Sequence, residues 1–161
     1  MELEIRQGGE PEEFIRLLMD VRNAMGESDW FYLDPPEEIR AMEPELWTAM
    51  DENRMAGALS ILRPGPAEYN YGFDLDFSEA ELHRVIQLDT VAVRPEYRGR
   101  GLQRILVAAA EKAQPKGSIF LCTVHPDNRY SLSNFLASGY HIAKTLPKYG
   151  SVRCILRKDL D

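Results

Sequence analysis

The stretch Leu88–Leu106, LDTVAVRPEYRGRGLQRIL, decides how the rest of the chain is interpreted. It opens with alternating β-branched residues between Thr90 and Val93, which favour a strand. The strand pattern stops at Pro95, and after the turn RGRG at 98–101 apolar residues recur at helical spacing. The turn therefore brings together backbone N–H groups, the positive end of a helix dipole and two guanidinium groups, which predicts an anion site.

Two common phosphate motifs do not fit this turn. A P-loop has a Lys followed by Ser or Thr after its glycines, and no such pair follows Gly99 and Gly101. A dinucleotide fingerprint has a third glycine, but Arg104 stands at that position and the turn lies in mid-chain. The spacing therefore excludes both alternatives.

Composition places the chain among ordinary globular proteins. The 161 residues are 44% hydrophobic and 28% charged, which favours one folded domain with its own core. The net charge of −7 argues against general nucleic-acid binding. No apolar run approaches the ~20 residues of a membrane span, and the acidic N-terminus does not resemble a signal peptide. Cys122 and Cys154 lie in apolar, strand-like runs, so we expect two buried thiols in a reducing, cytoplasmic compartment.

The periodicity along the chain predicts the element order β-α-α-β-β-β-α-β-α-β-β, a mixed α/β domain. The first helix begins at Pro11 and ends at Gly26, and a short helix follows Pro35 and Pro36. Residues 67–83 have no clear period, and we expect a long loop with one helical turn there. Two interpretations of the aromatic run 30–32 stay open: it lines an acceptor pocket, or it packs the short helix onto the sheet.

The segment Val91-Ala92-Val93, followed by Arg98-Gly99-Arg100-Gly101 and an apolar helix, resembles the acetyl-CoA motif of the GNAT N-acetyltransferase superfamily. The family pattern, Arg/Gln-x-x-Gly-x-Gly/Ala, lies on the turn after the fourth strand. Residues 98–101 match its first four positions, and Gln103 stands where the family usually has Gly or Ala. Gln103 either points away from the turn or adds an amide donor to a phosphate, and the sequence leaves both open.

A second block extends the resemblance. The turn His125-Pro126-Asp127-Asn128 and the segment after it are similar to the family helix Asn-x-x-Ala-x-x-x-Tyr-x-x-x-Gly-Phe. The spacing from Asn128 to Phe135 and to Gly139 agrees without a gap. The match at the level of sequence covers residues 85–157.

The resemblance implies one GNAT-like domain over residues 1–161, with a central, mixed but mostly antiparallel sheet of about seven strands and helices on both faces. It implies acetyl-CoA as co-substrate, with its pantetheine arm paired to the fourth strand and its pyrophosphate on the amides of the turn. Asn128 would contact the cofactor where the fifth strand splays from the fourth, and a plain helix cap is the competing role. The implied cofactor-binding residues are Val91, Ala92, Val93, Arg98, Gly99, Arg100, Gly101, Leu102, Gln103, Asn128, Ser131, Asn134 and Phe135.

The catalytic groups that the resemblance implies are less direct. The family acid is often a Tyr at the position of Phe135, which has no proton to donate, so Tyr130 and Tyr149 are the substitutes that stay open, and Tyr149 is taken as the candidate acid. A thiol pKa of ~8.5 makes thiolate a tolerable leaving group, so the acid is not indispensable. One family branch has a Glu base where this chain has Gln87, and Asp89, on the same strand face, becomes the candidate base. Structural roles compete with both assignments.

The resemblance thus implies an N-acetyltransferase that moves acetyl from acetyl-CoA to a primary amine of a small molecule, amino acid or protein. A backbone N–H would stabilise the oxyanion formed by direct attack of the amine. The alternative is a non-catalytic acyl-CoA-binding module, which Phe135 and Gln87 favour. Carboxylates between Glu68 and Glu81 favour a cationic acceptor slightly. We expect no metal, nucleic acid or membrane partner, and a homodimer is compatible with the family, whose members dimerise through several surfaces.

Overall fold

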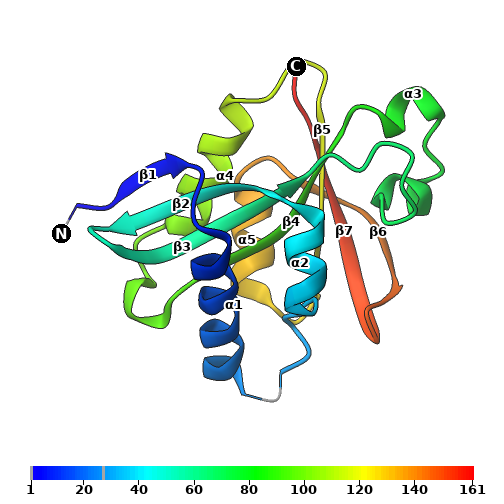
Figure 1. Cartoon of the computed structure of the whole chain (residues 1–161). Helices are drawn as coiled ribbons and strands as arrows, with labels where there is room; N and C mark the ends of the chain where they lie inside the picture. The colour runs from blue at the N-terminus through cyan, green and yellow to red at the C-terminus, as the bar shows by residue number, and fades with distance from the viewer. Residues whose placement is uncertain (1, 27) are drawn as a thin grey trace. The chain divides into compact units, whose positions relative to one another are not determined.

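The computed structural model describes residues 2–26 and 28–161, which form seven strands, five α-helices and two short 3-10 helices (Figure 1). Their bounds are β1 Glu4–Gln7, α1 Pro11–Met25, α2 Pro36–Met42, β2 Glu45–Asp51, β3 Arg54–Leu62, η1 Tyr71–Leu75, α3 Glu79–Leu82, β4 Val85–Val93, η2 Pro95–Tyr97, α4 Leu102–Lys112, β5 Ile119–Val124, α5 Arg129–Ala137, β6 His141–Lys148 and β7 Ser151–Asp159. Within this part of the chain, no helix is long and apolar enough to cross a bilayer.

The sheet has the topology expected from the sequence. Its strand order is β1-β2-β3-β4-β5-β7-β6. The pairs β1–β2, β2–β3, β5–β7 and β6–β7 are antiparallel, and the pair β4–β5 is parallel. The predicted order of strands and longer helices is therefore confirmed, as is the mixed, mostly antiparallel fold class.

The chain divides into two compact units that interleave along the sequence. Residues 2–61 and Thr90–Ala113 form the first unit, and Leu62–Asp89 with Gln114–Asp161 form the second. The strand β4 is shared, because its residues up to Asp89 belong to the second unit and those from Thr90 to the first. Each unit is described by itself below.

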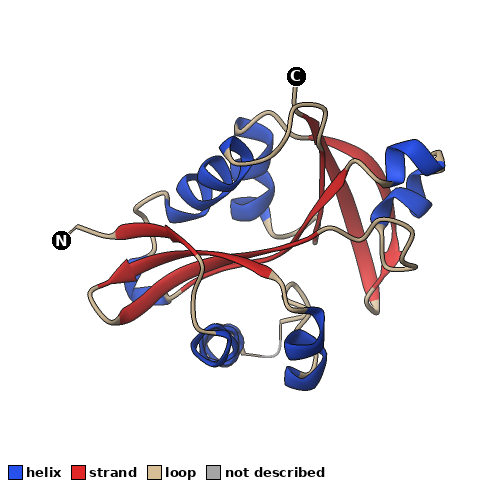
Figure 2. Cartoon of the chain, turned by 45° about the horizontal axis from the view of Figure 1, so that its top comes forward, coloured by secondary structure: helices blue, strands red, loops and turns tan. Residues whose placement is uncertain are grey.

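The first unit packs helices on both faces of its strands. Figure 2 shows α1 and α2 on one side of β1–β3 and α4 on the other. The helix α1 begins with Pro11, has two acidic residues in its first turn and ends at Gly26, whose φ of 68° suits a glycine C-cap. Its apolar stripe is buried against α2, β2, β3 and the end of β4, with a core made by Phe14, Ile15, Leu17, Leu18, Val21, Ile39, Leu46, Met50, Met55, Ala58 and Ala92.

The second unit builds its core around β4, β5 and β7. One face buries Val85, Ile119, Leu121 and Ile155 with Tyr71 from η1. Cys122 and Cys154 are buried free thiols, so the prediction of two thiols rather than a disulfide is confirmed. The turn between β6 and β7 is Tyr149-Gly150, with φ values of 56° and 81°. Positive φ at both central residues is the signature of a type I′ hairpin turn, in which Tyr is unusual.

The segment between β3 and β4 is more regular than expected. It contains two short helices, η1 and α3, where the sequence suggested one helical turn. Asn70 starts η1 by accepting a hydrogen bond from Gly72 N, and Ser78 and Glu81 form a capping box around α3. The difference arises because polar capping side chains define these two helices. A search for hydrophobic periodicity does not detect them.

Candidate functional site

The glycine-rich turn lies in the first unit, between η2 and α4. Gly99 and Gly101 have φ values of 81° and 71°, and an added Cβ at either would meet nothing within 4 Å. Gly101 is the N-cap of α4, and it has no side chain with which to cap this helix end. The turn thus presents a helix N-terminus beside an open space, and any residue other than glycine would place its side chain in that space. This geometry fits the predicted pyrophosphate cradle.

Tyr97 supports this turn from inside the first unit. Only 5% of the residue is exposed, and its hydroxyl donates a 2.5 Å hydrogen bond to Asp51 Oδ2 at the end of β2. The hydrogen bond to Asp51, together with burial, raises the pKa of Tyr97, so its hydroxyl stays protonated at neutral pH. The guanidinium groups of Arg54 and Arg100 lie 5.8 and 5.5 Å from the Tyr97 ring centroid. Arg100 therefore packs on a ring that is anchored to the sheet.

The arginines near the turn have different environments. Arg94 Nε donates to Met55 O at 2.8 Å, and its Nη1 lies 2.6 Å from Asp20 Oδ2 of α1. Arg94 is therefore structural. Arg98 and Arg100 are exposed on the turn itself, where both remain candidates for phosphate contacts. Gln103 is only 9% exposed, so this side chain is largely buried.

The predicted cofactor residues of the second unit lie on α5. Asn128 is its N-cap, with Oδ1 accepting from Ser131 N at 3.3 Å, so the competing role of a helix cap is present. Ser131 and Asn134 are half-buried along the helix. Phe135 is 3% exposed and packs edge-to-face on Tyr140, with ring centroids 5.1 Å apart. Phe135 is thus part of the core of this unit.

The strands β4 and β5 pair over a short length. The register joins Val85–Gln87 to Ile119–Leu121, whereas β4 continues to Val93 and β5 to Val124. Asp89 and Thr123 lie beyond this pairing, both in the second unit. Beyond the end of the parallel ladder, β4 and β5 therefore carry the polar residues Asp89 and Thr123.

The structure brings Asp89 and Tyr149 to the same residue, Tyr71. The Tyr71 and Tyr149 hydroxyl oxygens are 2.7 Å apart. The pKa of Tyr71 lies well above 10, because the ring is buried and because Tyr149 and the charge of Asp89 oppose its ionisation, while a hydrogen bond with Thr123 acts the other way. Sequence reasoning missed Tyr71, and its only signal was the aromatic and acidic stretch at 69–77.

Gln87, which stands where one family branch has a Glu, holds the segment before β4. Its Oε1 accepts from Tyr71 N and its Nε2 donates to Tyr69 O, both at 3.0 Å, and the residue is 1% exposed. Both ends of the amide are thus used by backbone groups. Gln87 therefore positions Tyr71.

The carboxylates expected to favour a cationic acceptor are not all open to one. Asp74 Oδ2 lies 3.0 Å from Lys148 Nζ, and Lys144 Nζ donates to Asp74 O at 2.9 Å. Two lysines of the chain thus already bond Asp74, Lys148 at its carboxylate and Lys144 at its backbone carbonyl. In the first unit, Phe31 packs on the core while Trp30 and Tyr32 are 41% and 48% exposed, so the aromatic run divides between its two predicted roles.

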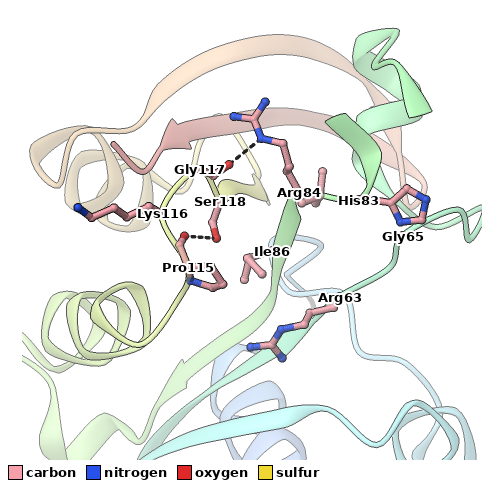
Figure 3. A pocket seen from close by; sticks show the side chains of 10 residues that line it. Arg63, Gly65, His83, Arg84, Ile86, Pro115, Lys116, Gly117 and Ser118 are labelled. Atoms are coloured by element: carbon pink, nitrogen blue, oxygen red, sulfur yellow. Dashed lines mark hydrogen bonds between the residues drawn. The ribbon is translucent and has the colours of Figure 1, made fainter. Parts of the chain in front are cut away.

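A pocket of about 360 Å³ opens elsewhere in the second unit (Figure 3). It is lined by Arg63, Gly65, His83, Arg84, Val85, Ile86 and residues 115–118. Arg84 Nε donates to Gly117 O across it at 2.8 Å. The pocket lies at the start of β4, and Asp89 lies four residues on, or roughly 13 Å along a strand. Its lining shares Val85 with the core around Tyr71 but includes none of Tyr71, Asp89 and Tyr149.

Comparison with known proteins identifies relatives of the whole fold. A family model for acetyltransferases of the GNAT family matches residues 12–140. A GNAT acetyltransferase of Streptococcus agalactiae is 19% identical, with a TM-score of 0.74, over 99% of this chain and 96% of the other. The yncA protein of Salmonella typhimurium, solved with acetyl-CoA, is 14% identical (TM-score 0.70, 100% and 95% covered). The phosphinothricin acetyltransferase of Sinorhizobium meliloti, also solved with acetyl-CoA, is 13% identical (TM-score 0.70, 99% and 89% covered). No curated protein sequence matches the chain.

Proposed function

Because the chain belongs to the GNAT family of acetyltransferases, we propose that it transfers the acetyl group of acetyl-CoA to a primary amine. The observation that carries the proposal is the turn at Gly99 and Gly101, where two positive-φ glycines leave open space beside an uncapped helix N-terminus. In this proposal the two units act as one acetyltransferase domain over residues 1–161, in a reducing, cytoplasmic compartment.

Acetyl-CoA would supply an activated acyl group as its thioester. The amides of residues 98–103 would hold its pyrophosphate, with charge added by Arg98 and Arg100. The backbone of Val91 to Val93 would pair with the pantetheine arm. Asn128, Ser131 and Asn134 on α5 are the further proposed contacts, and Phe135 would serve them as the buried support of the helix.

Asp89 and Tyr149 are the proposed base and acid. Asp89 would take one proton from the acceptor ammonium, and the neutral amine would then attack the thioester carbon, so that the C–N bond forms as the C–S bond breaks. The second proton that the nitrogen loses would pass to solvent. Tyr149 would donate its hydroxyl proton to the departing thiolate, and its 2.7 Å bond to the Tyr71 hydroxyl supports it in that position. The proximity of both groups to Tyr71 favours an enzyme over a binding module that never turns acetyl-CoA over.

The test is Asp89→Asn, assayed by CoA release with a panel of primary amines. We expect kcat/KM to fall about 10²- to 10⁴-fold at neutral pH, the usual contribution of a general base. The loss of kcat/KM relative to the wild type should become smaller as pH rises toward the amine pKa, because a larger fraction of the acceptor is then already neutral. Tyr149→Phe should cost about tenfold, since a thiolate with a pKa of ~8.5 leaves readily.

Acetyl-CoA affinity serves as the control for both variants, because neither group belongs to the glycine-rich turn. Unchanged kcat/KM in Asp89→Asn at every pH would remove Asp89 from the mechanism. Tight acetyl-CoA binding without CoA release for any amine would favour the acyl-CoA-binding module.

A further inference from the structure

The surroundings of Lys148 include Tyr149, the proposed acid, but the proposed chemistry gives no role to Lys148 or to its partner Asp74. Lys148 Nζ lies 3.0 Å from Asp74 Oδ2. It also lies 5.3 Å from the ring centroid of Tyr71 and 5.7 Å from that of Tyr149. A carboxylate and two aromatic faces thus surround one primary ammonium. We call Asp74, Tyr71 and Tyr149 the ammonium box.

The walls of the box are fixed independently of Lys148. Gln87 holds the Tyr71 backbone from β4, and Asn70 caps the same helix, η1, that carries Asp74. Lys144 Nζ donates to the Asp74 carbonyl at 2.9 Å. Tyr149 is held by its hydroxyl bond to Tyr71. The occupant, by contrast, is the end of a long and flexible side chain.

The chemistry of the box selects an alkylammonium group. Aromatic faces attract cations through their quadrupoles, and a carboxylate adds a charge-assisted hydrogen bond. The side chains of Lys148 and Asp74 are 24% and 27% exposed, so solvent reaches the pair. An external ammonium that enters the box replaces one ammonium–carboxylate pair with another, while the long Lys148 side chain moves its own ammonium into solvent, so the exchange costs little.

An ammonium inside the box is not the group that reacts. Asp74 and the two rings favour the charged form of any amine they hold, whereas attack on a thioester requires a neutral nitrogen. The group in the box therefore anchors an acceptor whose other amine is acetylated. Asp89, the proposed base, is a separate carboxylate on β4.

We infer that the ammonium box is the recognition subsite for the acceptor, that Lys148 fills it when no acceptor is bound, and that the acceptors are alkyl amines carrying a second ammonium group. The inference rests on the proposed amine acetylation, because it names the acceptor class for that reaction. In this inference, Lys148 competes with the second ammonium group of the acceptor for the ammonium box.

Three acceptors of matched length test the class: 1,5-diaminopentane, pentylamine and 5-aminopentanoate. We expect kcat/KM for the diamine to exceed that for pentylamine at least tenfold, with the aminopentanoate lowest because its carboxylate meets Asp74. Lys148→Met should lower KM for the diamine about tenfold, or about 1.4 kcal/mol. Asp74→Asn should reduce kcat/KM for the diamine to the value for pentylamine. Equal kcat/KM for the three acceptors in the wild type would overturn the inference.

Lys144→Met is the matched control, because Lys144 bonds the Asp74 carbonyl and not the Asp74 carboxylate that would receive the ammonium. It should leave the acceptor preference unchanged, and loss of the preference in this variant would contradict the assignment. Thermal unfolding of every variant checks that the fold is retained, and Lys148→Gln provides a second neutral side chain if Lys148→Met is unstable.

Equilibrium binding separates this inference from the proposed function. Calorimetric titration of 1,5-diaminopentane without acetyl-CoA should give tighter binding to Lys148→Met and weaker binding to Asp74→Asn than to the wild type. The same affinity for 1,5-diaminopentane in all three proteins would refute the claim that the ammonium box binds the acceptor, even if amines are acetylated. If no amine is acetylated, the proposed function fails, while the titrations still decide what the box binds.

Discussion

At the scale of one residue, Gly101 shows why this position of the turn requires glycine. Its φ of 71° is costly for a residue with a Cβ, and, apart from its two chain neighbours, no described residue has an atom within 4 Å of the place where that Cβ would be. The fold therefore leaves this space unused. Gly26 shares both features at the end of α1, so what distinguishes Gly101 is its place at the N-terminus of α4, where backbone N–H groups face the open space.

Gly101→Val should abolish acetyl-CoA binding while the chain still folds. The branched side chain would fill the space proposed for the pyrophosphate, and left-handed φ would cost roughly 1–2 kcal/mol of stability. Calorimetric titration with acetyl-CoA measures the first effect, and urea unfolding the second.

Gly26→Val is the matched control for backbone strain. Gly26 has a φ of 68° and also has no atom within 4 Å of an added Cβ, but it ends α1 rather than the glycine-rich turn. It should lose similar stability and keep its affinity for acetyl-CoA. If Gly101→Val bound acetyl-CoA as well as Gly26→Val does, the cradle would have been assigned to the wrong turn.

At the scale of elements, the segment from η1 to α3 is ordered by polar contacts rather than by an apolar face. Asn70 Nδ2 donates to Gly65 O and Leu82 O, which closes the segment on itself. An added Cβ at Gly72 would lie 2.7 Å from Phe77 and 2.8 Å from Leu82. Gln87 then joins the closed segment to β4. The segment thus depends on a few specific side chains.

Gln87→Glu should destabilise this segment rather than create a catalytic base. The carboxylate keeps an acceptor for Tyr71 N, but it loses the donor to Tyr69 O and places a charge where only 1% of the residue is exposed. We expect the free energy of unfolding at pH 7 to fall by about 2–4 kcal/mol. Urea unfolding measures this loss, and CoA release shows whether any activity is gained.

The pH dependence of that loss follows from burial. Burial raises the folded-state pKa of the new carboxyl group above its unfolded value of ~4.3, so the folded protein binds the proton more tightly. The loss is therefore full above the folded-state pKa and shrinks as pH falls through it. Gln87→Met, which is uncharged, should show no such recovery at low pH. Higher stability or activity for Gln87→Glu at pH 7 would contradict the positioning role.

Local patterns allowed the sequence to predict the elements and the glycine-rich turn. The glycines at 99 and 101, and the apolar positions of α4 just after them, are decided within a dozen residues, and the structure agrees with both. Tyr71 and Tyr149 are 78 residues apart, and no spacing rule joins them. The two bonds of Gln87 to backbone groups of another segment are equally invisible in sequence. What escaped prediction is long-range polar pairing.

At the scale of the whole molecule, the net charge of −7 contrasts with the arginines of the turn. Such a distribution suits a small polyanion bound at one place rather than a long polymer spread over a basic face. It also fits the proposed co-substrate, whose phosphates carry several negative charges.

Acetyl-CoA should therefore stabilise the whole protein. A ligand at 100 times its Kd adds about 2.7 kcal/mol to the free energy of unfolding. For a chain of this size the corresponding rise in Tm is roughly 5–10 °C. Differential scanning fluorimetry with acetyl-CoA, with acetate as the control, measures the shift. The absence of a shift at saturating acetyl-CoA would contradict both the enzyme and the acyl-CoA-binding alternative.

The interleaving of the two units also affects how the protein is made. On the ribosome, the first unit has all its residues once Ala113 has been synthesised, but Leu62–Asp89 must wait for partners that follow Gln114. During that interval Val85 and Ile86, both buried in the finished protein, lack the strand β5 on which they pair. This waiting segment is where a nascent chain would recruit chaperones or aggregate. Neither unit can be expressed as one continuous fragment.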